Sequence, residues 1–166
     1  MKRVIIAAVS DNGVIGTENS LAWKIPADEQ FLKEQIQGAA ILTGRTSFES
    51  AQGSALYACD PKVIILTHQK DYQAPPAVVV HSLTEAFAEA EKLDSDKLAI
   101  LGGGKVYEQT INQADELIIT EIHGNFSGDT HFPAIDPMIW LETRREDHAA
   151  DTTNSIPYSF VYYQRR

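Results

Sequence analysis

The sequence contains a single cysteine and few positive charges. Because Cys59 has no partner among the 166 residues, an intramolecular disulfide and every zinc site built from several cysteines are excluded. Lysine and arginine number 14 against 23 aspartate and glutamate residues, which gives a formal net charge of −9. A charge of this sign repels phosphate backbones, so we expect no nucleic-acid partner.

The start of the chain also lacks a long apolar run. The run that follows Lys2 and Arg3 covers only Val4–Val9, which is too short for a secretion signal or a membrane span. We therefore expect a cytoplasmic protein without a membrane partner, and we expect a monomer.

Motifs for hydrolytic and metal chemistry are missing as well. The segment Gly124–Gly128 has the wrong spacing for the G-x-S-x-G elbow of serine hydrolases. No H-E-x-x-H or H-x₃-H pattern occurs among the histidines, which are His68, His81, His123, His131 and His148. We expect neither a serine hydrolase nor a bound metal.

The chain does contain a regular alternation of short apolar runs and helical patterns. Runs rich in valine and isoleucine predict strands at Val4–Val9, Ala39–Thr43, Val63–Thr67, Ala77–Val80, Leu98–Leu101 and Leu117–Thr120. Helical patterns fall at Asp28–Gln37, Thr46–Ala51, Leu83–Leu93 and Val106–Asn112. This order predicts an α/β fold in one domain over residues 1–166, with a mostly parallel, twisted central sheet and helices on both faces.

The end of the chain follows a different pattern. The runs Trp140–Glu146 and Tyr158–Gln164 have no helix between them, so we expect an antiparallel pair at the edge of the sheet. Ser82 and Glu85 have the spacing of a capping box in front of the helix predicted from Leu83.

Three predicted strands are followed by basic residues. The segments that follow them are Gly44-Arg45-Thr46-Ser47 after Thr43, His68 after Thr67, and Gly102-Gly103-Gly104-Lys105 after Leu101. Ligands of open α/β sheets bind beyond the carboxyl ends of the strands, and helix starts favour anions. In an acidic protein this placement predicts a phosphate site, suited to a dinucleotide with an extra ribose phosphate. The alternative is that Arg45 and Lys105 are ordinary solvated charges.

The glycine run differs from the two common phosphate loops. Lys105 is followed by valine, which excludes a Walker A motif. Gly102 and Gly104, with Glu121 about 20 residues on, are similar to a Rossmann fingerprint, but Tyr107 stands where its third glycine should be. Successive glycines instead indicate a backbone that approaches a ligand, as a strained or cis peptide would allow.

Asp28 is the candidate acid. Pro26 marks a helix start, and the positions that share a helix face with Asp28 are Phe31, Leu32 and Ile36, all of them apolar. We therefore expect the Asp28 side chain to point toward the core.

A carboxylate on an apolar face needs a partner, because burying it alone costs several kcal/mol. That partner is either the free N–H groups at the start of its own helix or a ligand. Beside the flat ring of Trp23, Asp28 is suited to a heterocycle that bears adjacent N–H donors. Glu29 and Lys33 are expected to face elsewhere.

Taken together, the motifs resemble the dihydrofolate reductase family over nearly the whole chain. The matching segments are Ile6–Ala8, Gly13–Gly16, Asn19, Trp23, Pro26–Asp28, Thr43–Ser50, Leu101–Tyr107, Thr120 and Gly128–Pro133. The resemblance implies a reductase that transfers a hydride from NADPH to the pterin ring of dihydrofolate and so forms tetrahydrofolate.

The resemblance also implies roles for individual residues. Asp28 would bind the pterin N–H groups and promote protonation of the imine nitrogen, with Thr120 supporting it and Trp23 ordering a water. The substrate pocket would be lined by Ile6, Ala7, Leu32, Ala51 and Leu101. The cofactor would be held by Ala8, Ile15, Gly16, Gly44, Arg45, Thr46, Ser47, Thr67, His68, Gly102, Gly103, Gly104, Lys105, Val106 and Tyr107. Gly16–Leu21 would form a mobile lid that hydrogen-bonds to the loop around Asp129.

Two departures from the family pattern concern the substrate's glutamate tail. Family members usually carry an arginine just before the strand at Val63, where it binds the tail carboxylate, whereas this chain has Asp60–Lys62. Glu29 also stands at a position that is usually apolar. A lysine cannot reproduce the two parallel hydrogen bonds of an arginine, and Glu29 adds a negative charge. Both departures therefore work against binding of an anionic tail.

Two further departures concern neighbouring residues. The phenylalanine expected at Leu32 is shifted to Phe31, and Ala22 replaces a proline before Trp23. The second change is expected to loosen the lid.

Two other functions stay open on the sequence alone. A reductase of the same fold and cofactor could act on another pterin, or on a ribosylated aminopyrimidine as in riboflavin synthesis, although Asp28 argues against the latter. A nucleotide-binding module without catalysis would bind NADPH and not consume it.

Overall fold

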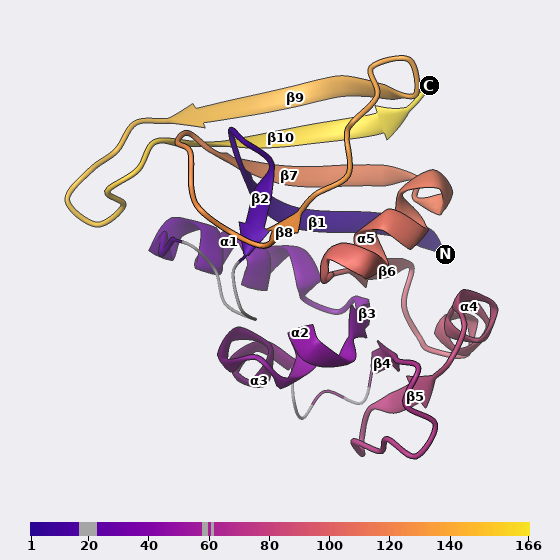
Figure 1. Cartoon of the computed structure of the whole chain (residues 1–166). Helices are drawn as coiled ribbons and strands as arrows, with labels where there is room; N and C mark the ends of the chain where they lie inside the picture. Colours follow the sequence, from indigo (N-terminus) through magenta and orange to yellow (C-terminus); the bar gives the residue numbers. More distant parts are fainter. Residues whose placement is uncertain (17–22, 58–59, 61) are drawn as a thin grey trace.

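The structure is a computed structural model that describes residues 1–16, 23–57, 60 and 62–166, with only the backbone of Ala51. In these residues the central sheet has eight strands in the order β5-β4-β3-β6-β1-β7-β10-β9. Their bounds are β1 (Lys2–Ser10), β3 (Ala40–Gly44), β4 (Val63–Leu66), β5 (Val78–Val80), β6 (Lys97–Ile100), β7 (Glu116–Ile122), β9 (Trp140–His148) and β10 (Tyr158–Arg165). Figure 1 shows β9 and β10, in orange and yellow, at one edge of the sheet and β5 at the other.

The sheet confirms the predicted α/β class. Strand β1 pairs in parallel with β6 and β7, and the same direction continues through β3, β4 and β5. Strand β10 pairs antiparallel with both β7 and β9, as predicted for the end of the chain. The carboxyl ends of the parallel strands therefore meet along one edge.

The helices cover both faces of the sheet. They are α1 (Pro26–Ile36), α2 (Arg45–Glu49), α3 (Ala51–Tyr57), α4 (Leu83–Glu91), α5 (Gly104–Thr110) and the short 3₁₀ helix η1 (Ile111–Gln113). The capping box is present in part, because the Ser82 side chain accepts from the Glu85 N–H, while the Glu85 carboxylate accepts from the His81 N–H. None of the helices in the described part is long and apolar enough to cross a membrane.

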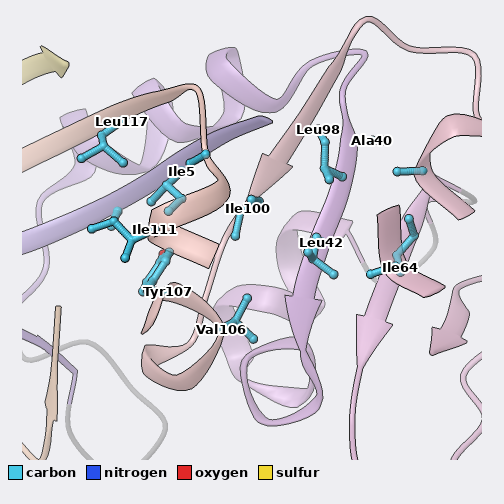
Figure 2. Close-up of a cluster of buried hydrophobic side chains, with 14 of the residues drawn as sticks. Ile5, Ala40, Leu42, Ile64, Leu98, Ile100, Val106, Tyr107, Ile111 and Leu117 are labelled. Carbon is cyan, nitrogen blue, oxygen red and sulfur yellow. The ribbon is translucent and has the colours of Figure 1, made fainter. Parts of the chain in front are cut away.

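Alternating residues of each strand fill two apolar cores. On β1, Ile5 and Ala7 join a cluster with α4 and α5, while Val4 and Ile6 join a second cluster with α1. Figure 2 shows the first of these, in which side chains from the strands meet Val106 and Tyr107 of α5. Because inner parallel strands such as β3 and β4 are buried on both faces, they are almost continuously apolar, and this pattern predicts them from the sequence.

The prediction of one helix over Thr46–Ala51 is wrong, because two helices, α2 and α3, occupy this region. Ser50 lies between them in an extended conformation, with φ −63° and ψ 160°. Its hydroxyl donates to the Ser47 carbonyl at 2.6 Å and accepts from the Gly53 N–H at 3.1 Å. One serine side chain therefore ends α2 and caps α3, and propensity along a continuous stretch does not reveal such a break.

The structure also contains a second sheet of two short strands, which the sequence pattern does not predict. Strands β2 (Val14–Gly16) and β8 (Thr130–His131) pair antiparallel. At three and two residues they are too short to show a period-two pattern. In addition, α5 begins two residues before the predicted start at Val106, so that Gly103 precedes its first residue.

Candidate active site

A cavity of about 1050 Å³ opens at the carboxyl ends of the parallel strands. Its lining contains most of the residues that the sequence singled out, namely Ile6, Ala7, Ala8, Ile15, Gly16, Trp23, Asp28, Leu32, Gly44, Arg45, Thr46, Ser47, Thr67, His68, Leu101, Gly103, Gly104, Lys105, Val106, Tyr107 and Thr120. Segments far apart in the chain thus converge on one space, as expected at this edge of an open α/β sheet.

Two residues that the resemblance assigns to the site, Gly102 and Ala51, are not among the lining residues of the cavity. Gly102 is buried, and its carbonyl accepts from the Gly44 N–H at 2.7 Å and from the Thr43 hydroxyl at 3.2 Å. The side chain of Ala51 lies outside the described residues, as does the predicted lid beyond Gly16.

Asp28 lines the cavity, in a part that we call the Asp28 end, and its carboxyl group is held by β7. The Thr120 hydroxyl donates to Asp28 Oδ1 at 2.6 Å, and Thr120 itself sits beside Ala8 of β1. Burial raises the pKa of Asp28 above its ordinary 3.8 to about 6, with a smaller rise from the negative Glu29, while the Thr120 hydrogen bond opposes this shift. Asp28 is therefore a carboxyl group that can exchange a proton close to neutral pH.

The N–H groups at the start of α1 are not the partners of the Asp28 side chain. Asp28 is the third residue of α1, and its own N–H donates to the Ile25 carbonyl at 3.0 Å. Among the described residues, no backbone N–H of the helix start donates to the Asp28 side chain, so its hydrogen bond goes to Thr120. The carboxylate lines the cavity and is open to a ligand there.

Glu29, expected on another face of α1 than Asp28, is still close enough to raise the pKa of Asp28. Glu29 lines the same cavity and adds negative charge next to Asp28. Successive residues of a helix point about 100° apart, and a cavity that wraps around the first turn can take both. Lys33, one turn later, is exposed and does not line the cavity.

Trp23 brings an unused donor to the Asp28 end. Its side chain is buried and packs against Phe126 with ring centroids 5.2 Å apart. The indole Nε1 is buried and, within the described part of the chain, has no hydrogen-bond partner. A buried donor of this kind costs free energy unless a ligand or water completes it.

Gly103 and Gly104 of the glycine turn line another part of the cavity, which we call the glycine-turn end. The Gly102–Gly103 peptide bond is cis, and Gly102 has φ +95°, a conformation that side chains rarely adopt. A Cβ on Gly102 would also lie 2.8 Å from the Tyr107 ring, whose hydroxyl donates to the Ile6 carbonyl at 2.8 Å. At Gly103 a Cβ would meet nothing within 4 Å, so the backbone there faces open space.

Positive charge is concentrated at the glycine-turn end. All lysines and arginines of the chain lie within the described residues, and three of them line the cavity: Lys24, Arg45 and Lys105. Arg45 begins α2 and pairs with Glu49 at 3.0 and 3.1 Å. Lys105 and His68 are exposed at the cavity. The sequence argument for a local cationic cluster in an acidic protein agrees with this placement.

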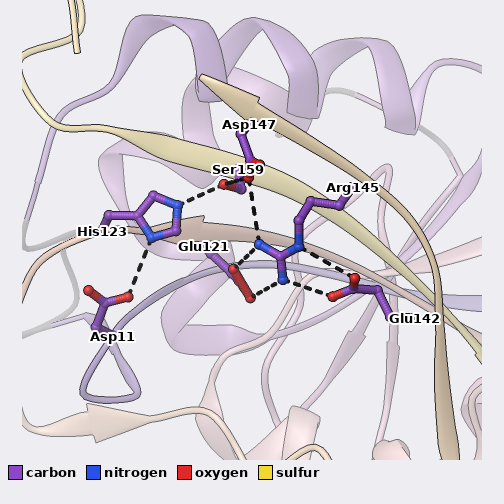
Figure 3. Close-up of polar contacts among 7 residues, drawn as sticks. All are labelled: Asp11, Glu121, His123, Glu142, Arg145, Asp147 and Ser159. Atoms are coloured by element: carbon purple, nitrogen blue, oxygen red, sulfur yellow. Dashed lines mark hydrogen bonds and ion pairs between the residues drawn. The ribbon is translucent and has the colours of Figure 1, made fainter. Parts of the chain in front are cut away.

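The Rossmann interpretation of Glu121 does not fit the structure. Glu121 pairs with Arg145 at 2.7 Å and does not line the cavity. Figure 3 shows this network on the strands β7, β9 and β10, where Arg145 also contacts Glu142 and Asp147. Glu121 is therefore a structural ion-pair partner rather than a ribose ligand.

Several lining residues are not among those that the sequence predicts for the site. They are Lys24, Phe31, Ser50, Gln52, Leu66, Gln69, His81, Ser82, Glu108, Gln109, Thr130 and His131. Thr130 and His131 belong to β8, which was too short to be recognised, although Gly128–Pro133 was one of the matching motifs. No group of three or more histidine, cysteine, aspartate or glutamate side chains in residues 1–16, 23–57, 60 and 62–166 is arranged to hold a metal ion.

The chain is similar to known proteins along almost its entire length. A family model described as dihydrofolate reductase matches residues 3–165. The type 3 dihydrofolate reductase of Salmonella typhimurium is 34% identical over 162 residues, covering 98% of this chain and 97% of that protein. The dihydrofolate reductase of Staphylococcus haemolyticus is 32% identical over 165 residues, covering 99% and 96%.

A solved structure gives the same result. The dihydrofolate reductase of Enterococcus faecalis, in complex with NADP(H) and the compound RAB-propyl, superposes with a TM-score of 0.85 at 34% identity, covering 99% of this chain and 96% of that one. Both the length of the sequence match and the shared fold lead to the same conclusion: the chain belongs to the dihydrofolate reductase family.

Proposed function

We propose that the protein reduces dihydrofolate to tetrahydrofolate with NADPH. One observation carries the proposal. A single cavity joins Asp28, a partly buried carboxyl group whose pKa is raised to about 6, to a glycine turn flanked by Arg45 and Lys105. The structural neighbour from Enterococcus faecalis binds NADP(H), which supports the same cofactor here.

The glycine-turn end suits an anionic dinucleotide. Gly103 presents bare backbone to open space, and a side chain there would occupy the cavity. Arg45, Thr46 and Ser47 at the start of α2, with His68 and Lys105, would hold the phosphates. The cavity volume of about 1050 Å³ exceeds that of most small-ligand pockets, so a dinucleotide and a second ring fit together.

The Asp28 end suits the pterin ring. The Asp28 carboxylate would accept two N–H groups from the ring and its amino substituent, while Thr120 fixes the orientation of the carboxylate. The ring would lie against apolar lining from Ile6, Ala7 and Leu32. Such a fit places the imine of the substrate between Asp28 and the glycine turn.

The chemistry divides between the cofactor and the chain. When bound, NADPH supplies the hydride that adds to the imine carbon of dihydrofolate, and residues of this chain handle the proton that the imine nitrogen takes up. With a pKa near 6, Asp28 favours protonation of the bound ring. The indole N–H of Trp23, which has no partner in the described part of the chain, would donate to a water that carries this proton.

Consumption of NADPH tests the proposal directly. We expect turnover with dihydrofolate and with a tail-less dihydropterin, and none with a ribosylated aminopyrimidine precursor of riboflavin. NADPH binding without consumption of any of the three would favour the non-catalytic module. Turnover of the aminopyrimidine alone would assign the chain to the other reductase.

The charge of the cavity makes a prediction about the substrate tail. The glutamate tail of dihydrofolate is anionic. Beside Asp28, however, the cavity lining contains a second acidic residue, Glu29, and only one basic residue, Lys24. Lys62 lies elsewhere, with its ammonium group on the Asp94 carbonyl at 2.7 Å. We infer that Glu29 weakens recognition of the tail.

Replacing Glu29 with glutamine is therefore expected to favour dihydrofolate over a tail-less dihydropterin. The ratio of their kcat/KM values rises about twofold to fivefold at low salt and less at high salt, because a repulsion between partly exposed charges is removed. Glu34→Gln is the matched control, since Glu34 lies on the same helix, is exposed and does not line the cavity. An unchanged ratio, or the same rise in the control, would contradict the inference.

A further inference from the structure

The helix that carries Asp28 lacks a cap of its own. Ile25 precedes α1, and its apolar side chain cannot accept a hydrogen bond from the first turn. The N–H group of Ala27 is satisfied instead by Asn154 Oδ1 at 3.0 Å. Asn154 lies 127 residues further along the chain, in the loop between β9 and β10.

Asn154 is itself held firmly in this loop. Only 6% of Asn154 is exposed. Asp151 Oδ1 accepts from the Asn154 N–H at 2.6 Å, from its amide group at 3.3 Å and from the Thr153 N–H at 2.8 Å, while the Asp151 N–H donates to the Asn154 carbonyl at 2.8 Å. These bonds lower the pKa of the exposed Asp151 and keep it ionised. Asp151 and Asn154 do not line the cavity.

We propose that Asn154 is a positioning residue for Asp28. The β9–β10 loop supplies the cap that the sequence around Ile25 does not provide, and so fixes the first turn of α1 from outside the cavity. Asp28 directly follows the capped residue Ala27, and its carboxyl group is held from the other side by Thr120. Asp28 thus lies between two anchors from different parts of the chain, on β7 and on the loop.

Three titratable groups from different elements interact electrostatically with Asp28: Glu29 on α1, Tyr107 on α5 and Tyr158 on β10. Tyr158 in turn interacts with Asp151 of the β9–β10 loop. Replacing Asn154 removes none of them. A change in the titration of Asp28 in an Asn154 variant would therefore report a change in the placement or burial of its carboxyl group.

The test compares Asn154→Ala and Asp151→Ala with Asn112→Ala, which replaces an exposed asparagine of η1. Its kinetic arm rests on the proposed function. We expect kcat for dihydrofolate to fall roughly tenfold in Asn154→Ala and less in Asp151→Ala, because a small displacement of a reacting group is costly. The Kd of NADPH, measured by fluorescence, stays within about twofold, since the cofactor end lies on other elements.

The second arm does not depend on turnover. In protein labelled with ¹³C at the aspartate carboxyl carbons, the Asp28 signal is the one lost in Asp28→Asn. Its titration midpoint, near 6 in the unchanged protein, is expected to fall in Asn154→Ala as a loosened first turn admits water. The midpoint stays in place in Asn112→Ala.

Each outcome decides the proposal. A lower Tm with unchanged kcat and an unchanged Asp28 midpoint would mean that Asn154 is only structural and would overturn it. If Asn154→Ala does not fold, the Asp151→Ala variant decides in the same way, because Asp151 is exposed. If the unchanged protein does not reduce dihydrofolate, the proposed function fails, while the carboxyl titration still tests the positioning of Asp28.

Discussion

Replacing Asp28 with asparagine is expected to lower kcat for dihydrofolate at pH 7 by about 10²- to 10⁴-fold, the range for loss of a general acid or base. Asparagine has nearly the same shape and its carbonyl oxygen can still accept from the Thr120 hydroxyl, so the site stays assembled. What is lost is a group that carries a negative charge or a proton near neutral pH. The loss should therefore appear in turnover rather than in folding.

The direction of the pH dependence follows from the raised pKa. With a pKa of about 6, about one Asp28 carboxyl in ten is protonated at pH 7, against about one in 1500 at the ordinary 3.8. Turnover in the unchanged protein should fall as pH rises through this range. The asparagine variant has no such group, so its rate should recover in acid, by up to about tenfold per pH unit, as the substrate arrives already protonated.

Steady-state rates from pH 5 to pH 8 for both proteins make the comparison. The Kd of NADPH serves as the internal control, because the side chains proposed to hold its phosphates lie on elements other than α1 and are unchanged in the variant. An asparagine variant with an unchanged rate at neutral pH would refute the role given to Asp28.

Replacing Arg45 with glutamine is expected to raise the Kd of NADPH by roughly 10- to 100-fold and the Kd of NADH by less than about threefold. A charge-assisted hydrogen bond to a phosphate contributes about 1.5 to 3 kcal/mol, and the extra ribose phosphate occurs only in NADPH. Arg45 begins α2, is half-buried and lines the cavity, and the prediction takes its guanidinium as the group that binds this phosphate.

The ion pair of Arg45 with Glu49 supplies the opposite test. Glu49 competes for the same guanidinium through hydrogen bonds of 3.0 and 3.1 Å. Glu49→Gln should therefore lower the Kd of NADPH and leave the Kd of NADH unchanged. Loss of the ion pair within the helix lowers the free energy of unfolding by only about 0.3–0.5 kcal/mol. Kd values measured at one fixed salt concentration decide the matter. An equal loss of both dinucleotides in Arg45→Gln would contradict this placement.

The parallel part of the sheet could be predicted because its inner strands are buried on both faces. The run Val4–Val9 is apolar throughout and Val63–Thr67 is apolar up to its last residue, and this local signal needs no knowledge of the neighbouring strands. The antiparallel end could be predicted because no helix separates Trp140–Glu146 from Tyr158–Gln164. By contrast, β2 and β8 are too short to carry a pattern.

The site was only partly predictable for a different reason. The apolar neighbours of Asp28 are local in sequence, so its direction followed from helix geometry. Its hydrogen bond to Thr120 depends on strand β7, 92 residues away, and was reached only through the family resemblance. The cap from Asn154 depends on a loop that packs against α1, and no local pattern indicates it.

The most direct test of the account follows the hydride itself. NADPH carrying deuterium at both C4 positions of the nicotinamide is incubated with the protein and dihydrofolate, and the tetrahydrofolate is examined by mass spectrometry and NMR. We expect one deuterium per product molecule, bound to the former imine carbon, while the hydrogen on the neighbouring nitrogen comes from water. Tetrahydrofolate without deuterium at that carbon, or no tetrahydrofolate while NADPH remains bound, would contradict the account.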